Sequence, residues 1–401
     1  MNLDAPSPKA VASAALDPSQ PRRVMVADQE LTVFAESPPL IEAILTDLRS
    51  ARSRIWVETY IFFNDQAGTA VAEALQERAR DGLDVRLLYD AVGSGSAPAS
   101  FFRRLEYAGV QVHAFHSLWE ALWRFSFFRI LNRRDHRKLL IIDDRVAYFG
   151  GMNLADPGQI RSGVRRRAAS TGWRDIHIRL CGSRQAELAE SFERSWKRAQ
   201  RLPVPTLPRS HRQARFKDGV EAIQFFDCGP GRRHTRAARV FAAVVRQTRR
   251  SLMLSMAYFL PFGRVLRELL KAHRRGIFLR VVVPGASDVP LVQSATRHLY
   301  MKLIRKRFHI FERQRNMLHS KVVVADEERC IVGSCNLDAR SLRINLEFLA
   351  VIQSRSLAGV LSEIIQFEVA HSHRITVKEC LQRSWWRRVL DRMAWGLRWW
   401  L

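Results

Sequence analysis

Two stretches of this chain repeat one another at their polar positions: HRKLLIIDDRVAYFGGMN at residues 136–153 and HSKVVVADEERCIVGSCN at residues 319–336. Both begin His-x-Lys, place an aspartate after four further residues, and end Gly-(Gly or Ser)-x-Asn, with identical spacing throughout. A motif this specific, found twice, escapes the usual false-positive warning for short patterns. One copy suggests half of a site, and two copies predict two halves that meet around a single site.

The spacing within each stretch predicts a β-hairpin. The apolar runs at 139–142 and 322–325 are typical of buried strands, and the acidic residues that follow supply turn chemistry before a second apolar run. Because residues i and i+2 of a strand face the same side, the histidine and the lysine point together. The return strand brings the glycine and the asparagine back beside them. Each half then offers an imidazole, an ammonium and an amide, a set that suits a phosphoryl group.

At these residues the chain resembles the phospholipase D superfamily, whose signature is this doubled His-x-Lys-x4-Asp motif followed by Gly-(Gly or Ser)-x-Asn. Within it the chain is similar to the bacterial cardiolipin synthases over about residues 25 to 375. Because no N-terminal membrane span is visible in the sequence, the resemblance is strongest to the type-B synthases. The segments that carry the closer likeness are 58–63 (ETYIFF), 82–90 (GLDVRLLYD), 93–94 (GS), 173–175 (WRD), 256–261 (MAYFLP) and 345–347 (NLE).

Strands and helices alternate along the chain, which indicates an α/β fold. We expect two phospholipase D-like halves, each a mixed β-sheet flanked by helices, packed around one shared active site. The expected strands lie at 55–63, 85–90, 252–260 and 278–283, and the expected helices at 68–81, 99–108, 263–275 and 291–306.

Composition suggests the domain boundaries. Residues 1–24 read as a disordered N-terminal tail, 25–201 as the first half, 202–218 as a proline-containing linker, 219–378 as the second half, and 379–401 as an amphipathic membrane-associating helix. In this last segment tryptophans and arginines interleave at helical spacing, as in interfacial helices, so we favour a membrane role over docking on the protein's own core. The apolar stretch at 118–131 is either a buried core helix or a membrane-inserting segment.

The charge balance indicates an anionic partner. The chain has 401 residues, a formal net charge of +26 and a pI near 11, for which nucleic acid and an anionic membrane both fit. The resemblance favours a membrane containing phosphatidylglycerol and no nucleic acid. Five cysteines without metal-ligand spacing predict a reduced, cytosol-facing location, and no run of about eighteen uncharged apolar residues predicts a transmembrane helix. We expect a peripheral protein on the cytoplasmic side of the cell inner membrane.

The resemblance also implies the site residues. Each histidine needs a carboxylate to fix its tautomer, and chain order assigns Asp175 to the first half and Glu347 to the second. Asp143 and Asp326 belong to the motif, but their place at the hairpin turns favours hydrogen-bond anchoring over proton transfer. The implied catalytic set is His136, Lys138, Asp143, His319, Lys321 and Asp326, and the implied phosphate-binding set is Gly151, Asn153, Ser334 and Asn336.

The mechanism that the resemblance implies is a two-step phosphatidyl transfer through a phosphohistidine. The family places the nucleophile in the N-terminal motif, hence at His136, and the other histidine exchanges the proton. Two ammoniums and two amides hold the phosphoryl oxygens, so we expect no metal and no cofactor. Phosphatidylglycerol is the expected donor and acceptor, and the sequence leaves open whether phosphatidylethanolamine takes either place. The alternatives are a phospholipase D-type lipid hydrolase, a superfamily nuclease acting on DNA, and a non-enzymatic basic membrane-binding protein. The sequence leaves the oligomeric state open.

Overall fold

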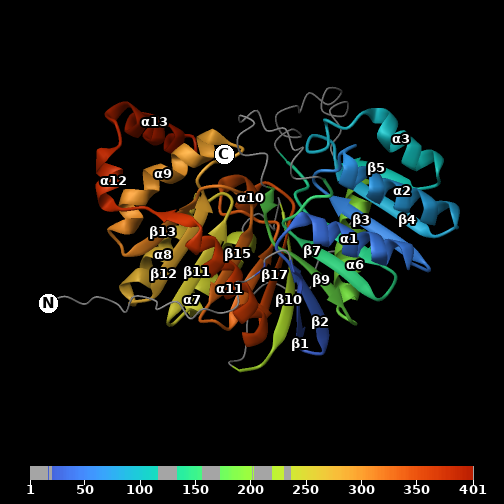
Figure 1. Ribbon diagram of the computed structural model, residues 1–401, viewed down its shortest axis with the longest axis horizontal. Helices are drawn as coiled ribbons and strands as arrows, with labels where there is room; N and C mark the ends of the chain where they lie inside the picture. The colour runs from blue at the N-terminus through green and yellow to red at the C-terminus, as the bar shows by residue number, and fades with distance from the viewer. Residues whose placement is uncertain are drawn as a thin grey trace.

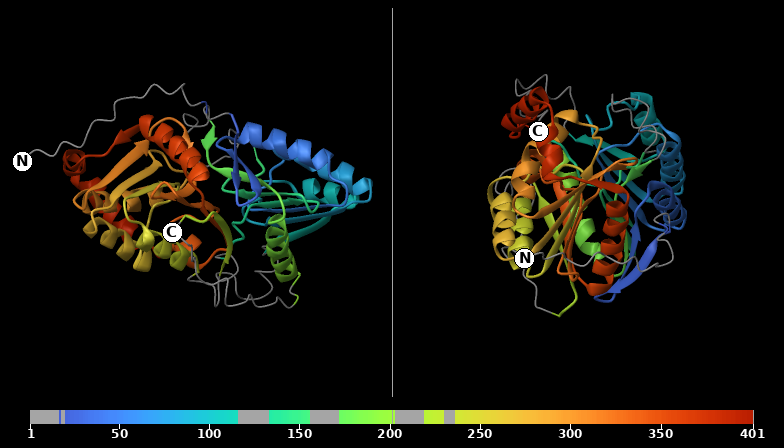
Figure 2. Two further views of the ribbon diagram at one scale, coloured as in Figure 1. Left: turned by 90° about the horizontal axis from the view of Figure 1, so that it is seen from below. Right: turned by 60° about the vertical axis from the view of Figure 1, so that its left-hand side comes forward.

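The computed structural model describes residues 17, 20–115, 133–155, 172–200, 202, 219–229 and 236–400. The apolar stretch at 118–131, nearly all of the expected linker and most of the expected tail lie outside the described residues, so those expectations stay predictions. The described residues form two mixed eight-stranded sheets that lie side by side, each flanked by helices (Figures 1 and 2).

The first sheet has the strand order β1-β2-β9-β7-β6-β3-β4-β5. Strands β3, β4 and β5 are parallel and are joined by the helical crossovers α2 and α3. The other neighbours pair antiparallel, and hairpins join β1 to β2 and β6 to β7. The elements of this half are β1 (Arg22–Val26), β2 (Gln29–Phe34), α1 (Ser37–Arg49), β3 (Arg54–Thr59), α2 (Gln66–Arg80), β4 (Asp84–Asp90), α3 (Ala99–Tyr107), β5 (Gln111–Phe115), β6 (Leu139–Ile142), β7 (Val146–Gly150), β8 (Trp173–Arg174), β9 (His177–Cys181) and α6 (Gln185–Ala199).

The second sheet, β10-β17-β16-β15-β11-β12-β13-β18, repeats the first. The run from β2 to β5 in the first sheet matches the run from β10 to β13 in order and in direction, so the expected repeated α/β fold is confirmed. The elements are β10 (Ala222–Cys228), α7 (Arg236–Gln247), β11 (Ser251–Met256), α8 (Gly263–Arg274), β12 (Phe278–Pro284), α9 (Pro290–Ile304), β13 (Phe308–Arg313), β14 (Met317–Leu318), β15 (Lys321–Ala325), β16 (Arg329–Gly333), α10 (Ala339–Arg343), β17 (Glu347–Gln353), α11 (Arg355–Ala370), β18 (Ser372–Arg374), α12 (Val377–Gln382) and α13 (Trp385–Gly396).

One apolar core is shared by the two halves. It joins Phe149 and Phe192 of the first half to Phe348 and Leu361 of the second, while each half keeps a separate core on the other face of its sheet. The rings of Phe149 and Phe348 lie 5.9 Å apart edge to face, which adds about 0.5–1.5 kcal/mol to the burial itself. The motif strands β6, β7, β15 and β16 are buried throughout, which explains their uninterrupted apolar sequences.

The C-terminal segment differs from the single helix expected at 379–401. Helices α12 and α13 are separated at Arg383 and Ser384, and α13 packs against α9 with Asp391 and Ala394 buried. Docking on the protein's own surface, which we disfavoured, therefore occurs along one side of α13. Within the described residues, no helix combines the length and the apolar character needed to cross a bilayer.

Substitution by alanine should change the stability of the protein in opposite directions at two glycines. A Cβ on Gly333 would lie 2.1 Å from the carbonyl oxygen of Phe348, whereas a Cβ on Gly359, inside α11, would meet nothing within 4 Å. We expect Gly333→Ala to destabilise the protein by about 2 kcal/mol or more, because strand backbone must move. Gly359→Ala should stabilise it by about 0.5–1 kcal/mol. Thermal unfolding of both variants measures this, and an unchanged midpoint for Gly333→Ala would contradict the close strand approach.

Candidate active site

Short backbone bridges between the halves position both motif histidines. Strand β14 ends just before His319 and pairs in parallel with β8, which ends just before Asp175. The N–H of His319 extends this pairing by donating to the carbonyl of Arg174 at 2.7 Å. The equivalent bond runs from the N–H of His136 to the carbonyl of Leu346, the residue before Glu347, at 2.9 Å. Each histidine is thereby set beside an acid of the opposite half.

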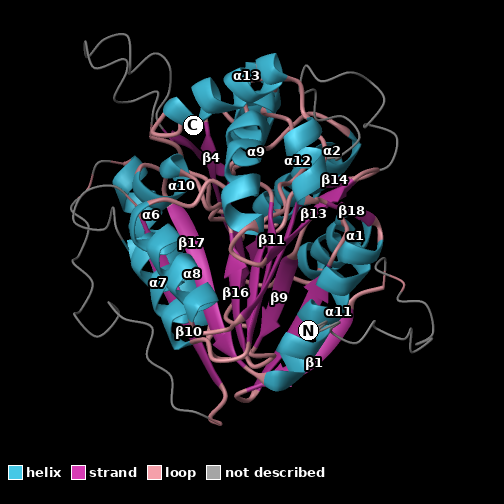
Figure 3. Ribbon diagram, turned by 90° about the vertical axis from the view of Figure 1, so that its left-hand side faces the viewer, coloured by secondary structure: helices cyan, strands magenta, loops and turns pink. Residues whose placement is uncertain are grey.

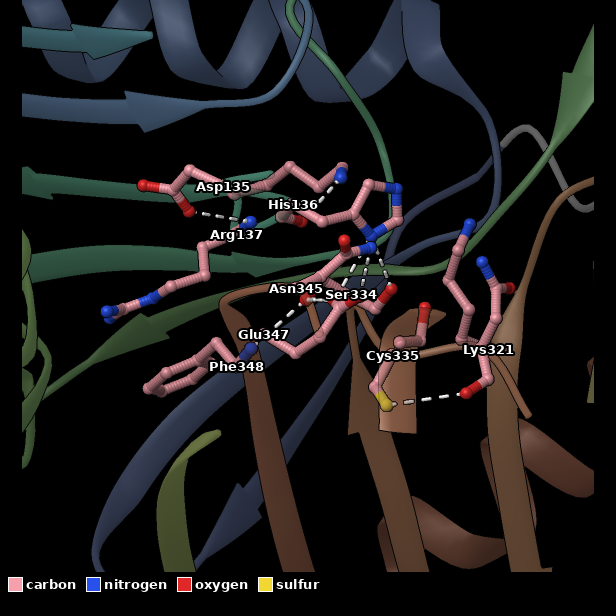
Figure 4. Close-up of polar contacts among 12 residues, drawn as sticks. Asp135, His136, Arg137, Lys321, Ser334, Cys335, Asn345, Glu347 and Phe348 are labelled. Atoms are coloured by element: carbon pink, nitrogen blue, oxygen red, sulfur yellow. Dashed lines mark hydrogen bonds and ion pairs between the residues drawn. The ribbon is translucent and has the colours of Figure 1, made fainter. Parts of the chain in front are cut away.

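The side chains complete these cross-half pairs. Nδ1 of His136 lies 3.1 Å from Oε2 of Glu347 (Figure 4), and Nδ1 of His319 lies 2.7 Å from Oδ2 of Asp175. Chain order led us to expect the reverse assignment, with Asp175 serving the first half and Glu347 the second. The structure corrects that expectation: both acids orient histidines, but they are exchanged between the halves.

Both histidine rings are held in a form that can react. Nδ1 of His136 also lies 3.0 Å from the carbonyl oxygen of Ser334, which can only accept, so Nδ1 carries the proton and Nε2 keeps its lone pair. Burial lowers the pKa of His136 to about 4, against the opposing effect of Glu347, so the ring is neutral at pH 7. Burial and the charge of Lys321 lower the pKa of His319 as well.

The two acids are ionised despite their burial. Burial alone would raise the pKa of Asp175, but the charge of Lys321, whose Nζ lies 3.1 Å away, and the bond from His319 together lower it. In the same way His136 and Lys138 outweigh burial and lower the pKa of Glu347. Ionised carboxylates at these positions stabilise the imidazolium that forms when a histidine takes up a proton or bonds to phosphorus.

Two buried lysines complete the constellation. Nζ of Lys138 donates to the carbonyl of His136 at 2.6 Å, and Nζ of Lys321 donates to the carbonyl of His319. Burial, together with the charge of Lys321, lowers the pKa of Lys138 to about 7 against the opposing charge of Glu347, because the two motifs share one electrostatic environment. Burial also lowers the pKa of Lys321, although Asp175 opposes this. An incoming phosphodiester anion would favour the charged form of both.

Gly151 and Ser334, which occupy equivalent positions in the two motifs and were expected to bind phosphate, lie against the two acids. A Cβ on Gly151 would lie 2.2 Å from Oδ1 of Asp175, so the glycine makes room for that carboxylate. Oγ of Ser334 donates to Oε2 of Glu347 at 2.5 Å and accepts from the N–H of Phe348 at 3.1 Å. Gly151 and Ser334 therefore both help to position a carboxylate, and their contact with phosphate stays a prediction.

The two motif asparagines lie buried in the site. A cavity of about 20 Å³, room for about one water molecule, is lined in part by Asn153, Asp175 and His319. Among the described residues, Oδ1 of Asn153 and Oδ1 of Asn336 are buried without a hydrogen-bond partner. A buried amide oxygen without a hydrogen-bond donor lowers the stability of the fold unless a ligand supplies the donor. That these asparagines contact the phosphoryl group stays a prediction.

Asp143 and Asp326 lie at the hairpin turns and tie each hairpin to the strand beside it. The carboxylate of Asp143 accepts from the backbone N–H groups of residues 52–54 at 2.9–3.2 Å, and that of Asp326 from residues 249–251 at 2.7–3.1 Å. Both residues have positive φ, 52° and 56°, which aspartate tolerates in turns. Their inclusion in the catalytic set is corrected to the anchoring role that their turn position favoured.

A buried ion-pair network behind His136 was missed at the sequence level (Figure 4 shows Arg137). Arg137 points to the strand face opposite His136, with its guanidinium 3.5 Å from Oε1 of Glu58 and 3.3 Å from Oδ1 of Asp227. The available signal was Glu58, a carboxylate that follows the apolar run of β3, since such a charge is buried only with a partner. At the equivalent positions the second half has two hydroxyls, Ser255 and Ser320, 2.5 Å apart.

Aromatic rings also cover both histidines, and they were not singled out as site residues. Tyr60 meets His136 edge to face at 4.9 Å, and its ring lies 5.2 Å from Nζ of Lys138. Trp173 lies 4.8 Å from His319. These rings contribute to the desolvation that keeps the histidines neutral.

Removing the charge of either acid should disable the histidine of the opposite half. Asp175→Asn and Glu347→Gln keep side-chain size, and we expect each to slow turnover by about 10²- to 10⁴-fold. Histidine ¹⁵N NMR locates the effect: Asp175→Asn should shift Nδ1 of His319 and leave that of His136 nearly unchanged, and Glu347→Gln should do the reverse. A shift confined to the histidine of the same half would refute the exchanged pairing.

Comparison with known proteins agrees with this geometry. The family model described as "Cardiolipin synthase, PLD-like domain" (PLD, phospholipase D) matches residues 44–162 and 242–367, so each matched segment contains one motif. Cardiolipin synthase A of Pseudomonas fluorescens is 30% identical over 381 residues, which are 95% of this chain and 77% of that protein. The major cardiolipin synthase of Bacillus subtilis is 29% identical over 92% of this chain and 75% of that protein. The closer likeness to type-B synthases stays a prediction.

Solved structures agree on the fold. Phosphatidylserine synthase from Haemophilus influenzae superposes with a TM-score of 0.67 at 15% identity, over 96% of this chain and 98% of that one. Polyphosphate kinase from Porphyromonas gingivalis reaches 0.56 at 13% identity, over 87% of this chain and 49% of that one. At such identities the likeness concerns architecture alone. The family match, by contrast, spans both halves and both histidines, and the chain therefore belongs to the phospholipase D superfamily as an enzyme of its cardiolipin synthase family.

Proposed function

We propose that the protein is a cardiolipin synthase that transfers a phosphatidyl group between two molecules of phosphatidylglycerol and releases glycerol. The observation that carries the proposal is the pair of histidines, each bonded to an ionised carboxylate of the opposite half. Two separately oriented imidazoles suit a reaction in which one attacks phosphorus while the other exchanges a proton. The relatives named cardiolipin synthase support the choice of lipid.

In the first step, Nε2 of His136 attacks the phosphorus of one phosphatidylglycerol, and the bond from phosphorus to the glycerol headgroup oxygen breaks. His319, which the anionic substrate favours in its protonated form, gives that oxygen its proton, so glycerol leaves as a neutral alcohol. Glu347 stabilises the positive charge that develops on His136. The nearly symmetric motifs would accommodate the reverse roles, and we place the nucleophile at His136 from the family resemblance.

In the second step, a headgroup hydroxyl of another phosphatidylglycerol gives its proton to Nε2 of His319 and attacks the same phosphorus. The phosphorus–nitrogen bond breaks, its electron pair returns to His136, and cardiolipin leaves. His319 is protonated again, so both residues end as they began. Lys138 and Lys321 supply positive charge to the non-bridging oxygens inside a buried site, where it is most effective.

We place the protein peripherally on the cytoplasmic side of the cell inner membrane, with anionic phospholipid as its partner. The net charge of +26 supports this, because each Lys or Arg near an anionic surface contributes about 1 kcal/mol that salt screens. That no metal or cofactor is involved stays a prediction. Among the residues that the structure describes, no group of three or more His, Cys, Asp or Glu side chains is arranged to hold a metal ion.

Purified protein incubated with phosphatidylglycerol vesicles should form cardiolipin and glycerol in equal amounts. Because both histidines act in one unit, His136→Ala and His319→Ala should each lower turnover by about 10⁴-fold or more, while the exposed His371 serves as a matched control whose His371→Ala variant keeps full activity. Lipid products are separated by chromatography, with plasmid DNA as a parallel substrate. Phosphatidic acid in place of cardiolipin would indicate a hydrolase, and DNA cleavage without lipid turnover would indicate a nuclease.

The pH dependence should reveal Lys138. Burial lowers the pKa of this ammonium to about 7, so the free enzyme loses the charge that attracts the phosphodiester as pH rises through 7, and kcat/KM should fall above that pH. The value of kcat, which reports the enzyme with substrate bound, should hold to higher pH because the bound anion raises the pKa of Lys138. Lys138→Arg stays charged and should lose the alkaline decline in kcat/KM. A kcat/KM that is flat across about pH 6 to 9 in the unaltered protein would contradict this.

A further inference from the structure

Helix α13 is held to the protein by a narrow side only. Asp391 and Ala394 are buried against α9, and Nη2 of Arg383 bonds to Oδ2 of Asp391 at 3.0 Å. Trp395 stacks on His298 of α9 at 5.7 Å. Figures 1 and 3 show α13 lying across α9 at the edge of the second half. The helix is therefore fixed in place rather than tethered by a loose segment.

The apolar side of α13 faces away from the protein. At about 100° per residue, its exposed apolar side chains cover an arc of about 140° on the side opposite Asp391 and Ala394. A helix at the surface of a globular protein normally turns this arc toward the core, so α13 is inverted. The side chains of the arc are 48% to 76% exposed, and they are Trp385, Trp386, Val389, Leu390, Met393 and Leu397.

Arginines border this arc on both sides. Arg387 lies on one flank, with its guanidinium 5.1 Å from the ring of Trp386, and Arg388 and Arg392 lie on the other, all exposed. An exposed apolar patch of this size calls for a partner. In a dimer formed through this surface, these arginines would face the same arginines of the second copy and repel them, whereas anionic lipid headgroups would neutralise their charge. The charge therefore favours a lipid surface over a dimer.

The end of α13 reaches the elements that carry the second motif. Trp399, just beyond the helix, meets Phe262 edge to face at 5.0 Å, and the guanidinium of Arg343 lies 5.8 Å from its ring. Arg343 is the last residue of α10, the short helix that follows Asn336. In Figure 1, α13 lies at the upper left edge of the molecule and α10 lies nearer its centre. The C-terminal end of α13 is thus joined through Trp399 to the elements that flank the second motif.

We infer that α13 is a preassembled docking surface for an anionic bilayer: it lies in the interface plane with its apolar arc in the acyl region and its arginines at the lipid phosphates. The inference rests on the proposed lipid substrate and adds the surface that brings the site to it. Because the helix is fixed against α9 and contacts α10 through Trp399, it also sets the orientation in which the site meets the membrane.

Point substitutions test this better than a truncation, because removing the segment would expose the side of α9 that α13 covers. Leu390→Ser/Met393→Ser changes the arc only. Met25→Ser/Val220→Ser is the matched control, because those side chains are equally exposed and lie on β1 and just before β10, at the lower edge of Figure 1. Co-sedimentation with mixed phosphatidylglycerol and phosphatidylcholine vesicles is measured in about 1 M salt, where the Debye length is about 3 Å. The arc variant should bind at least about tenfold more weakly than the control.

Two further readouts separate the possible outcomes. On water-soluble short-chain phosphatidylglycerol the arc variant should turn over like the unaltered protein, and on vesicles it should be slower. The inference would be overturned if the arc variant bound vesicles as well as the control, or if it lost turnover on the soluble lipid. It would also be overturned if the variant lost self-association but still bound vesicles, because the arc would then be the contact surface for a second copy of the chain. Salt-resistant vesicle binding through the arc by a protein that makes no cardiolipin would support the docking surface and reject the proposed function.

Discussion

The bond between each motif histidine and a carboxylate of the opposite half is the interaction on which this active centre depends. It fixes the protonated nitrogen of a buried imidazole, and it keeps an anion where positive charge would appear if the ring took up a proton or bonded to phosphorus. The backbone enforces the same contact, since the N–H of each histidine bonds to the carbonyl that precedes the acid. Two short cross-half bridges, rather than the order of residues in the chain, therefore decide which acid serves which histidine.

Those bridges also explain why the halves act as one body. A buried acid or ammonium costs several kcal/mol unless it is paired, and in this site the partners of Asp175 and Glu347 come from across the boundary. Separating the halves would leave these groups without counter-charges and would expose the core around Phe149 and Phe348. The requirement for a dry, charged site and the requirement for a shared apolar core thus favour the same arrangement.

The sequence predicts what depends on local periodicity. The hairpins after His136 and His319, and the elements β3, α2, β4, α8 and β12, fall within a few residues of their expected bounds, because strand and helix periods are properties of neighbouring residues. The exchanged acids could not be read this way, since their pairing depends on contacts between distant segments. The same limit hid the role of Gly151, whose missing side chain matters only once Asp175 is placed. The docking of α13 on α9 was not predicted either, because the burial of Asp391 and Ala394 depends on a helix distant in the chain, whereas the composition of α13 shows only its apolar and arginine-rich character.

The late position of Glu347 has a consequence for biosynthesis. A growing chain folds from its N-terminus, so the hairpin that follows His136 can form on the ribosome long before β17, which begins with Glu347, has been made. Until then His136 lacks the acid that orients it. In the same way Asp175 lacks its partner until His319 has been made. A first half without β17 therefore lacks the carboxylate that completes the half-site of His136. Because each half-site is distributed over both ends of the chain, neither half-site can be complete until synthesis has passed most of the second half.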